Sequence, residues 1–196
     1  GWDDSVRWDA GIYTVWPVDL NSYMVMLYDA MAYMADRLGE PAWTWREKGR
    51  ELAARINDRL FDERDGSYKD YDFGRGAFSP VLSPACFVPL YARIASPERA
   101  TSLAKLAADP AKFYPGMPTV SYDNPEYADF FWRGPTWLNT AYFALKGLKF
   151  YGHEVADGSR ETILDWCAAN EDFIYEYYDS KTGKGLGAQQ FSWSAV

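Results

Sequence analysis

The sequence predicts an all-α protein made of helical hairpins that curve into part of a ring. Apolar residues recur at helical spacing over several long stretches, and glycine or proline separates these stretches. Strands and helices do not alternate in the way that a parallel sheet requires. Because the hairpin layout recurs three times, we expect half of a six-hairpin α/α toroid.

The first predicted hairpin joins a helix at 20–38 to a helix at 41–60. Gly39 ends the first helix, and Pro41 suits the opening turn of the second. The first helix carries an apolar stripe at i, i+3, i+4 and i+7 spacing, which is typical of an amphipathic helix. The stripe consists of Leu20, Tyr23, Met24, Leu27, Met31, Met34 and Leu38.

Four more helices are predicted along the chain. Their bounds are 83–95, 96–108, 135–151 and 157–178. In the first of them Ser83 is a suitable N-cap, and Pro89 is expected to kink or end the helix. The loop at 109–134 is rich in proline, and a loop of such length in a compact domain usually serves function.

An acidic turn at 62–68 follows the first hairpin. Tyr68 and Tyr71 beside it are expected to form a short extended pair. The spacing of the acidic residues does not fit an EF-hand loop, so we predict no metal here.

The composition disfavours several classes of function. The formal net charge is −8, whereas a nucleic-acid binder needs a basic face. No apolar run approaches the roughly 18 residues that a membrane span requires. With His153 as the single histidine, and with Cys86 and Cys167 lacking metal-site spacing, we predict no metal and no cofactor. The cysteines leave the compartment open.

The aromatic content is high, at 18% of the residues. It fits either an aromatic helical core or a carbohydrate cleft, because the apolar C–H faces of sugars lie on aromatic rings. Composition alone leaves both interpretations open.

Three polar, aromatic segments stand out from the helical pattern. In 1–9, Asp3 follows Trp2, and an indole neighbour favours the neutral carboxyl group that a general acid needs. In 131–139, a Gly-Pro step lets the backbone approach a ligand closely. In 175–193, Glu176 lies at the predicted end of a helix, where cations are normally favoured. The alternatives are a solvated loop for the first segment and buried aromatic residues for the second.

Together and in this order, the motifs GWDDSVRWD, FWRGPTWLN and EYYDSKTGKGLGAQQFSWSA resemble those of the glycoside hydrolases of family 63. Relatives there include bacterial α-glucosidases and mannosylglycerate or glucosylglycerate hydrolases, and the family 37 trehalases look like more distant cousins. The blocks at 18–21 and 87–95 are also similar, so the resemblance covers nearly the whole chain. Val6 and Ser180 stand where proline is common.

The resemblance implies an (α/α)6 barrel that hydrolyses an α-glycosidic bond with inversion. The family's general acid matches Asp3, and its general base matches Glu176. An inverting pair stands roughly 6.5–9.5 Å apart, with a water between base and sugar. Residues 1–196 would form the C-terminal portion of one catalytic domain, with a carbohydrate as substrate and the N-terminal half of the barrel as partner.

The predicted substrate pocket is aromatic and polar. Its expected members are Trp2, Tyr122, Trp132, Arg133, Trp137, Gln190 and Trp193. For each tryptophan a place in the core is the alternative. Asp4 and Asp9 are expected to be structural and to pair with Arg7.

Two further functions are alternatives for this sequence. A non-catalytic carbohydrate-binding or remnant domain would keep the aromatic cleft without a working carboxylate pair. A sugar epimerase on the same barrel type relies on two histidines, which the single histidine here disfavours. The sugar itself stays open: glucose, mannose, a disaccharide or a glycerate glycoside would all fit the pair. Because the chain starts without methionine and ends in a run of structured character, we expect it to be either a fragment of a longer protein or a processed form.

Overall fold

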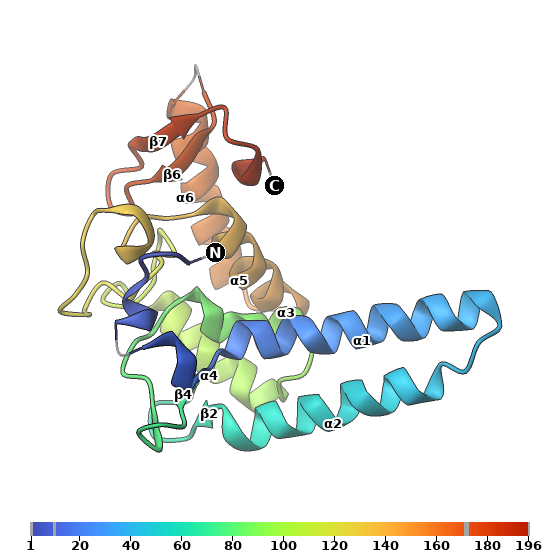
Figure 1. Cartoon of the computed structure of the whole chain (residues 1–196). Coiled ribbons are helices and arrows are strands. Elements are labelled where there is room, and N and C mark those ends of the chain that lie inside the picture. The colour runs from blue at the N-terminus through green and yellow to red at the C-terminus, as the bar shows by residue number, and fades with distance from the viewer. Residues whose placement is uncertain (1, 10, 171–172, 196) are drawn as a thin grey trace.

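The computed structural model describes residues 2–9, 11–170 and 173–195. Gly1 of the first motif and residues 171–172 of the last predicted helix lie outside the described residues. The described chain is built mainly from helices (Figure 1). These are α1 (Val18–Leu38), α2 (Trp43–Arg59), α3 (Val88–Tyr91), α4 (Pro97–Ala108), α5 (Leu138–Phe150) and α6 (Val155–Ala169).

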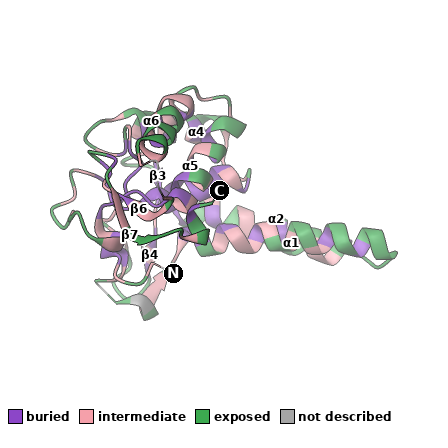
Figure 2. Cartoon of the chain, turned by 90° about the horizontal axis from the view of Figure 1, so that it is seen from above, coloured by how far each residue is buried: buried purple, intermediate pink, exposed green. Residues whose placement is uncertain are grey.

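Helices α1 and α2 form a long antiparallel hairpin that projects from the body of the molecule (Figure 1). Gly39 ends α1 in the left-handed conformation, with φ 74°, as expected for a glycine at this position. The buried residues of α1 are mainly small: Val18, Asp19, Ser22, Val25, Ala32 and Ala35. The outer part of the hairpin is largely exposed (Figure 2).

The core lies where the other helices meet the base of this hairpin. Helix α3 contacts both α1 and α5, and α6 contacts α4 and α5. Four fully buried side chains, Phe87, Leu90, Leu103 and Leu148, belong to this core. The three hairpins therefore follow one another in space in chain order, as a ring segment requires.

Two predicted helices are wrong in extent. In place of the helix predicted at 83–95, the structure has a 3₁₀ turn at Pro84–Phe87 followed by the short α3. Helix α3 ends at Tyr91, soon after Pro89. The prediction at 157–178 is wrong at its end, because α6 stops at Ala169. Beyond it the chain forms a hairpin of two antiparallel strands, β6 (Tyr175–Tyr178) and β7 (Gly185–Gln189).

The remaining strands are two residues long. A sheet contains β1 (Val15–Trp16), β4 (Tyr71–Asp72) and β5 (Ala77–Phe78), and β2 (Phe61–Asp62) pairs with β3 (Ser67–Tyr68). Tyr68 thus pairs with Phe61, and Tyr71 pairs with Trp16 and Phe78. The predicted pairing of the two tyrosines with each other is wrong. Of the described helices, none combines the length and apolarity that crossing a bilayer demands.

Candidate active site

An open cleft of about 740 Å³ lies between the N-terminal loop, the start of α1 and the start of α5. We call it the aromatic cleft. It is lined by Trp2, Asp3, Trp8, Pro17, Asp19, Leu20, Tyr23, Trp132, Asn139, Thr140, Phe143 and Trp193. Rings from five separate parts of the chain therefore line the same cleft as the carboxylate of Asp3. Apolar faces beside a few polar groups are the usual lining of a carbohydrate or small-molecule site.

The loop that carries Asp3 is held by its own backbone. The Trp2 carbonyl oxygen accepts hydrogen bonds from the Ser5 amide, at 3.1 Å, and from the Trp8 indole Nε1, at 2.7 Å. Ser5 caps a 3₁₀ turn, η1 (Val6–Trp8), through a 3.3 Å hydrogen bond that its hydroxyl accepts from the Arg7 amide. The side chain of Asp3 is exposed at the mouth of the cleft.

Beneath this loop, Arg7 is buried between two carboxylates. Its guanidinium donates four hydrogen bonds of 2.8–2.9 Å, two to Asp19 and two to Asp70. It also lies over the rings of Trp2 and Trp8, at 4.7 and 4.6 Å from their centroids. The expectation that Arg7 pairs with Asp4 and Asp9 is wrong. Instead Arg7 fastens the Asp3 loop to the start of α1 and to the segment before β4.

Charge in this cluster is set by the same contacts. Burial opposes ionisation of Asp19, but the attraction and hydrogen bonds of Arg7 outweigh it and lower the pKa of Asp19. Burial and the negative charge of Asp19 raise the pKa of Tyr23, which lies across the cleft wall. The cleft thus contains an ionised carboxylate beside a neutral phenol.

A second connection runs from the N-terminal loop to the turn η4 (Phe131–Arg133). The Asp4 carboxylate accepts a hydrogen bond from the Trp132 amide, at 3.1 Å. Arg133 donates to the Asp4 carbonyl oxygen, at 2.9 Å, and to both carboxylate oxygens of Asp9, at 3.2 and 2.7 Å. Asp4 and Asp9 are therefore structural, as expected, although Arg133 and the η4 backbone are their partners.

Four rings form a continuous aromatic column from Trp2 to Tyr177. Trp2 is tilted against Trp132 with centroids 5.3 Å apart, and Trp132 stacks on Trp137 at 3.6 Å. Trp137 in turn stacks on Tyr177 at 5.1 Å. Because Trp2 precedes Asp3 and Tyr177 follows Glu176, this column connects the two segments that carry the predicted catalytic carboxylates.

Glu176 lies on β6, where the register with β7 shifts between Tyr175 and Tyr177. A bulge of this kind redirects a side chain. The Glu176 carboxylate accepts a hydrogen bond from the Ala188 amide at 3.0 Å. The backbone carbonyl oxygen of Glu176 accepts one from the Ser194 hydroxyl. The sequence predicted Glu176 at the end of a helix, where a carboxylate would be unfavourable. This prediction is wrong, because Glu176 lies on a strand. The neighbouring turn η5 (Ser192–Ser194) carries Trp193 into the cleft.

The structure brings together some of the predicted residues and not others. Trp2, Asp3, Trp132 and Trp193 line the aromatic cleft. The other predicted residues are not among the residues that line it: Tyr122, Arg133, Trp137, Gln190 and Glu176.

Local contacts explain these positions. The Tyr122 hydroxyl donates to the Ser180 carbonyl oxygen at 2.6 Å, which holds it away from the cleft. Trp137 is buried behind Trp132 and donates to the Phe131 carbonyl oxygen. Gln190 is exposed after β7 with a φ of 57°. Arg133 is bonded to Asp4 and Asp9 and so connects η4 to the N-terminal loop.

Several cleft residues were not anticipated: Trp8, Pro17, Asp19, Leu20, Tyr23, Asn139, Thr140 and Phe143. Most come from the first two turns of α1 and α5, the two helices that follow the aromatic segments. The polar residues Asp19 and Asn139 at those starts were the available signal.

Comparison with known proteins identifies relatives along nearly the whole chain. The model of the "mannosylglycerate hydrolase MGH1-like glycoside hydrolase domain" matches residues 1–194. A mannosylglycerate hydrolase from Rubrobacter radiotolerans is 35% identical over 191 residues, which cover 94% of this chain and 43% of the relative. Mannosylglycerate hydrolase MGH1 from Selaginella moellendorffii is 34% identical over 155 residues, covering 75% and 31%.

Among solved structures, a GH63 mannosylglycerate hydrolase from Thermus thermophilus, in complex with glucose, superposes with a TM-score of 0.82 at 28% identity. The match covers 92% of this chain and 46% of that one. The neutral trehalase of Saccharomyces cerevisiae shares the fold, with a TM-score of 0.74. Both neighbours are (α/α)6 barrels. The predicted fold class is confirmed, and the chain spans less than half the length of these relatives.

Proposed function

Because this chain belongs to the family of mannosylglycerate hydrolase MGH1-like glycoside hydrolase domains, we propose that it supplies the catalytic half of an inverting glycosidase. The proposed substrate is a small α-linked glycoside, either an α-mannoside or an α-glucoside. The names of the relatives favour a sugar joined to glycerate. One observation carries the proposal: Asp3 opens onto a cleft lined with indoles, and the aromatic column connects its loop to the strand of Glu176.

In the proposed reaction, Asp3 is the general acid. It lies beside Trp2 at the cleft mouth, where it can donate a proton to the leaving glycosidic oxygen. The sugar ring rests its C–H faces on the indoles of Trp2, Trp132 and Trp193. The ionised Asp19 at the cleft wall is a suitable hydrogen-bond acceptor for sugar hydroxyls.

Glu176 is the proposed general base. One oxygen of its carboxylate, Oε2, is held by the Ala188 amide, which fixes the group on the β6–β7 hairpin. In the proposed reaction the other oxygen takes a proton from water as that water attacks the anomeric carbon. The two roles require opposite protonation states, so inversion needs both carboxyl groups at once.

The decisive experiment compares two isosteric variants with a matched control. Asp3→Asn and Glu176→Gln are each expected to reduce hydrolysis of mannosylglycerate by at least about 100-fold, as loss of a general acid or base does. Glu51→Gln changes an exposed carboxylate on α2, outside the residues that line the cleft, and should leave the rate unchanged. Retained activity in either test variant would refute the assignment.

The stereochemistry and the sugar are tested with the same protein. Proton NMR of the first product should show the β-anomer from an α-linked substrate, whereas the α-anomer would exclude inversion. A panel of mannosylglycerate, glucosylglycerate, trehalose and maltose identifies the preferred glycoside.

A second function is favoured by one observation: Glu176 is not among the residues that line the cleft. A chain with Asp3 in an aromatic cleft and no base near it would bind a sugar without cleaving it. Calorimetric titration of the 196-residue chain with the same panel distinguishes the two. Binding without release of sugar favours the non-catalytic domain.

A further inference from the structure

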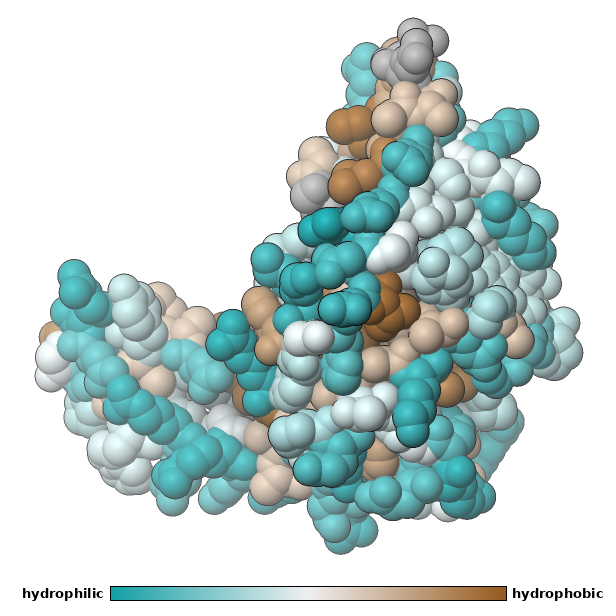
Figure 3. All heavy atoms as spheres, turned by 180° about the vertical axis from the view of Figure 1, so that it is seen from behind, coloured by the Kyte–Doolittle hydropathy of each residue, from teal (hydrophilic) through white to brown (hydrophobic). Residues whose placement is uncertain are grey.

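Packing contributes little to holding the hairpin that carries Glu176. On the arm of the molecule that carries α6 and this hairpin, apolar side chains such as Leu164 and Ile174 are exposed (Figure 3). Both strands of the hairpin are described in full: Tyr178 is buried in β6, and no residue is buried in β7. Segments with few buried contacts open readily. The place of the Glu176 carboxylate therefore depends on specific contacts rather than on burial.

Gly187 faces the Glu176 carboxylate across the hairpin. A Cβ at position 187 would lie 2.6 Å from Glu176 Oε2 and 2.9 Å from Glu176 Cβ. Non-bonded carbon atoms pack at about 3.5–4.0 Å, well beyond the second of these distances. The side chain of Glu176 thus occupies the space that any side chain at position 187 would need.

The irregularity in the strand pairing places two residues opposite Glu176. At the shift in register, Gly187 and Ala188 of β7 face this one residue of β6. A glycine in the left-handed region is the usual first residue of such a bulge, and Gly187 has a φ of 72°. The amide that follows it, that of Ala188, donates to Glu176 Oε2 at 3.0 Å. We call Gly187 and Ala188 the Gly187 bulge.

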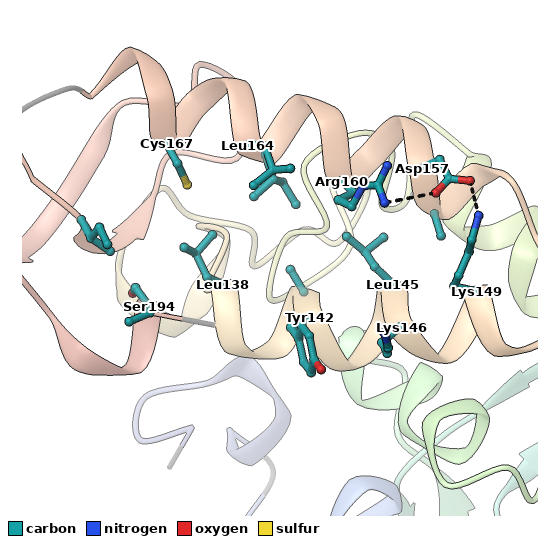
Figure 4. Close-up of a pocket in the computed structure, with 15 residues that line it drawn as sticks. Leu138, Tyr142, Leu145, Lys146, Lys149, Asp157, Arg160, Leu164, Cys167 and Ser194 are labelled. Atoms are coloured by element: carbon teal, nitrogen blue, oxygen red, sulfur yellow. Dashed lines mark hydrogen bonds and ion pairs between the residues drawn. The ribbon is translucent and has the colours of Figure 1, made fainter.

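A third contact fixes the backbone of Glu176. Its carbonyl oxygen accepts a 3.0 Å hydrogen bond from the hydroxyl of Ser194, which is buried. Ser194 lines a cavity of about 410 Å³ between α5 and α6, where it lies near Leu138 at the start of α5 (Figure 4). The bond connects β6 to the turn η5, whose Trp193 lines the aromatic cleft. The backbone of Glu176 is therefore tied to a wall of the cleft, while the Gly187 bulge holds its carboxylate.

We infer that Gly187 is a positioning residue for Glu176, because its missing side chain and its left-handed backbone together hold the Glu176 carboxylate in one place. The inference rests on the general-base role proposed for Glu176. Gly187 and Ala188 are not among the residues that line the aromatic cleft, so they act through Glu176 and not on the substrate. A base works only within hydrogen-bond reach of its water, and a misplacement of about 1 Å costs up to about 100-fold in rate.

The first test is Gly187→Ala, with Gly152→Ala as the matched control. The new Cβ at position 187 displaces the carboxylate, so kcat for mannosylglycerate should fall by at least about tenfold while KM changes by less than about twofold. Gly152 has a φ of 78° and open space where its Cβ would lie. Its replacement introduces similar backbone strain without a contact, and kcat should stay unchanged.

A second comparison separates positioning of the base from general damage. In the Glu176→Gln background, Gly187→Ala should lower the rate by less than about twofold, because its effect passes through the carboxylate. Added azide should restore turnover of Gly187→Ala, since azide attacks without losing a proton. Its nitrogen bonds to the anomeric carbon as the glycosidic C–O bond breaks, and Asp3 protonates the leaving oxygen. The expected product is the β-glycosyl azide, seen by NMR.

Amide exchange tests the geometry without substrate and without a change at Gly187. Glu176→Ala removes the acceptor of the Ala188 amide, whose exchange should become at least about threefold faster. The Gly183 amide is the control, because it donates to the Asp179 carbonyl oxygen in the same hairpin and should exchange at an unchanged rate. If Gly187→Ala does not accumulate, this measurement decides alone.

The outcomes separate the inference from the proposed function. Loss of activity in Glu176→Gln together with unchanged kcat in Gly187→Ala overturns the inference and leaves the proposed function standing. An equal loss from Gly187→Ala in the Glu176→Gln background, no turnover with azide, or unchanged exchange of the Ala188 amide also overturns the inference. Full activity in Glu176→Gln refutes the proposed base, and the inference falls with it.

Discussion

Replacing Arg7 with methionine tests how the Asp3 loop is held in place. The side chains of Arg7, Asp19 and Asp70 are exposed by only 0, 7 and 4%. Removal of one member of such a buried group leaves uncompensated charge and typically costs about 3–5 kcal/mol. Each carboxylate keeps one backbone donor, Val18 for Asp70 and Leu20 for Asp19, so we expect a loss near the lower end, about 3 kcal/mol at pH 7.

The loss of stability in Arg7→Met is expected to depend on pH through the pKa of Asp19. Burial opposes the charge of Asp19, yet Arg7 outweighs it and lowers the pKa of Asp19 in the folded protein. That stabilisation is therefore present above the unfolded pKa of about 3.9 and is lost as the pH falls through the folded pKa. Without the cation, burial raises the pKa of Asp19 and the folded variant takes up a proton. The penalty of Arg7→Met should shrink by about 1 kcal/mol or more between pH 7 and pH 5.

Urea unfolding followed by tryptophan fluorescence at the two pH values measures both quantities. Arg64→Met is the control, because Arg64 also pairs with a buried carboxylate, Asp62, but is itself 81% exposed and should matter little. A loss below about 1 kcal/mol, or an equal loss at both pH values, would refute the account of the buried cluster.

Two further predictions concern glycine packing and cysteine reactivity. Gly134→Ala would place a Cβ 2.3 Å from the Ala128 carbonyl oxygen, so we expect it to lower the free energy of unfolding by about 1–3 kcal/mol, measured in urea. Gly49→Ala is the control, because its nearest contacts are at 3.5 Å inside a helix, and it should be neutral or stabilising; a larger loss for Gly49→Ala than for Gly134→Ala would contradict this reasoning. Burial raises the pKa of both the Cys86 and Cys167 thiols, and Cys86 is fully buried. A thiol reagent at pH 8 should therefore modify Cys167 slowly and Cys86 only after unfolding. Rapid labelling of both thiols in the native protein would show that the core is open.

Most helices could be predicted because their signals are local. The prediction at 20–38 matches α1, which ends at Gly39. The prediction at 96–108 matches α4, which Ser96 caps at its N-terminus. The apolar stripe correctly identified α1 as a helix. It did not predict which face is buried, since α1 packs through its small residues and leaves Leu20, Leu27, Met34 and Leu38 of the stripe exposed.

The end of α6 could not be predicted from local pattern. Tyr175–Tyr178 is aromatic enough to continue a helix or to form a strand, and the pairing with Gly185–Gln189 decides for the strand. The partners of Arg7 were missed for a similar reason. Asp70 lies 63 residues away along the chain, whereas Asp4 and Asp9 are its sequence neighbours.

For the aromatic cleft, the motifs predicted the segments that line it more reliably than the individual side chains. Asp3 and Trp132 were predicted and do line the cleft, because each sits on a turn next to it. Trp137 lies behind Trp132, and Tyr122 is bound to Ser180, positions that only the tertiary packing determines. The catalytic roles of Asp3 and Glu176 stay predictions.

The column of four rings also works as a spacer of fixed thickness. Aromatic rings in van der Waals contact resist compression, so the gap between the loop of Trp2 and the strand of Tyr177 is set by how many rings are stacked between them. The cleft wall contributed by Leu20 and Tyr23 belongs to α1, which carries none of the four stacked rings. A substitution at Leu20 or Tyr23 can therefore reshape the cleft while the stack keeps the distance between the two segments unchanged.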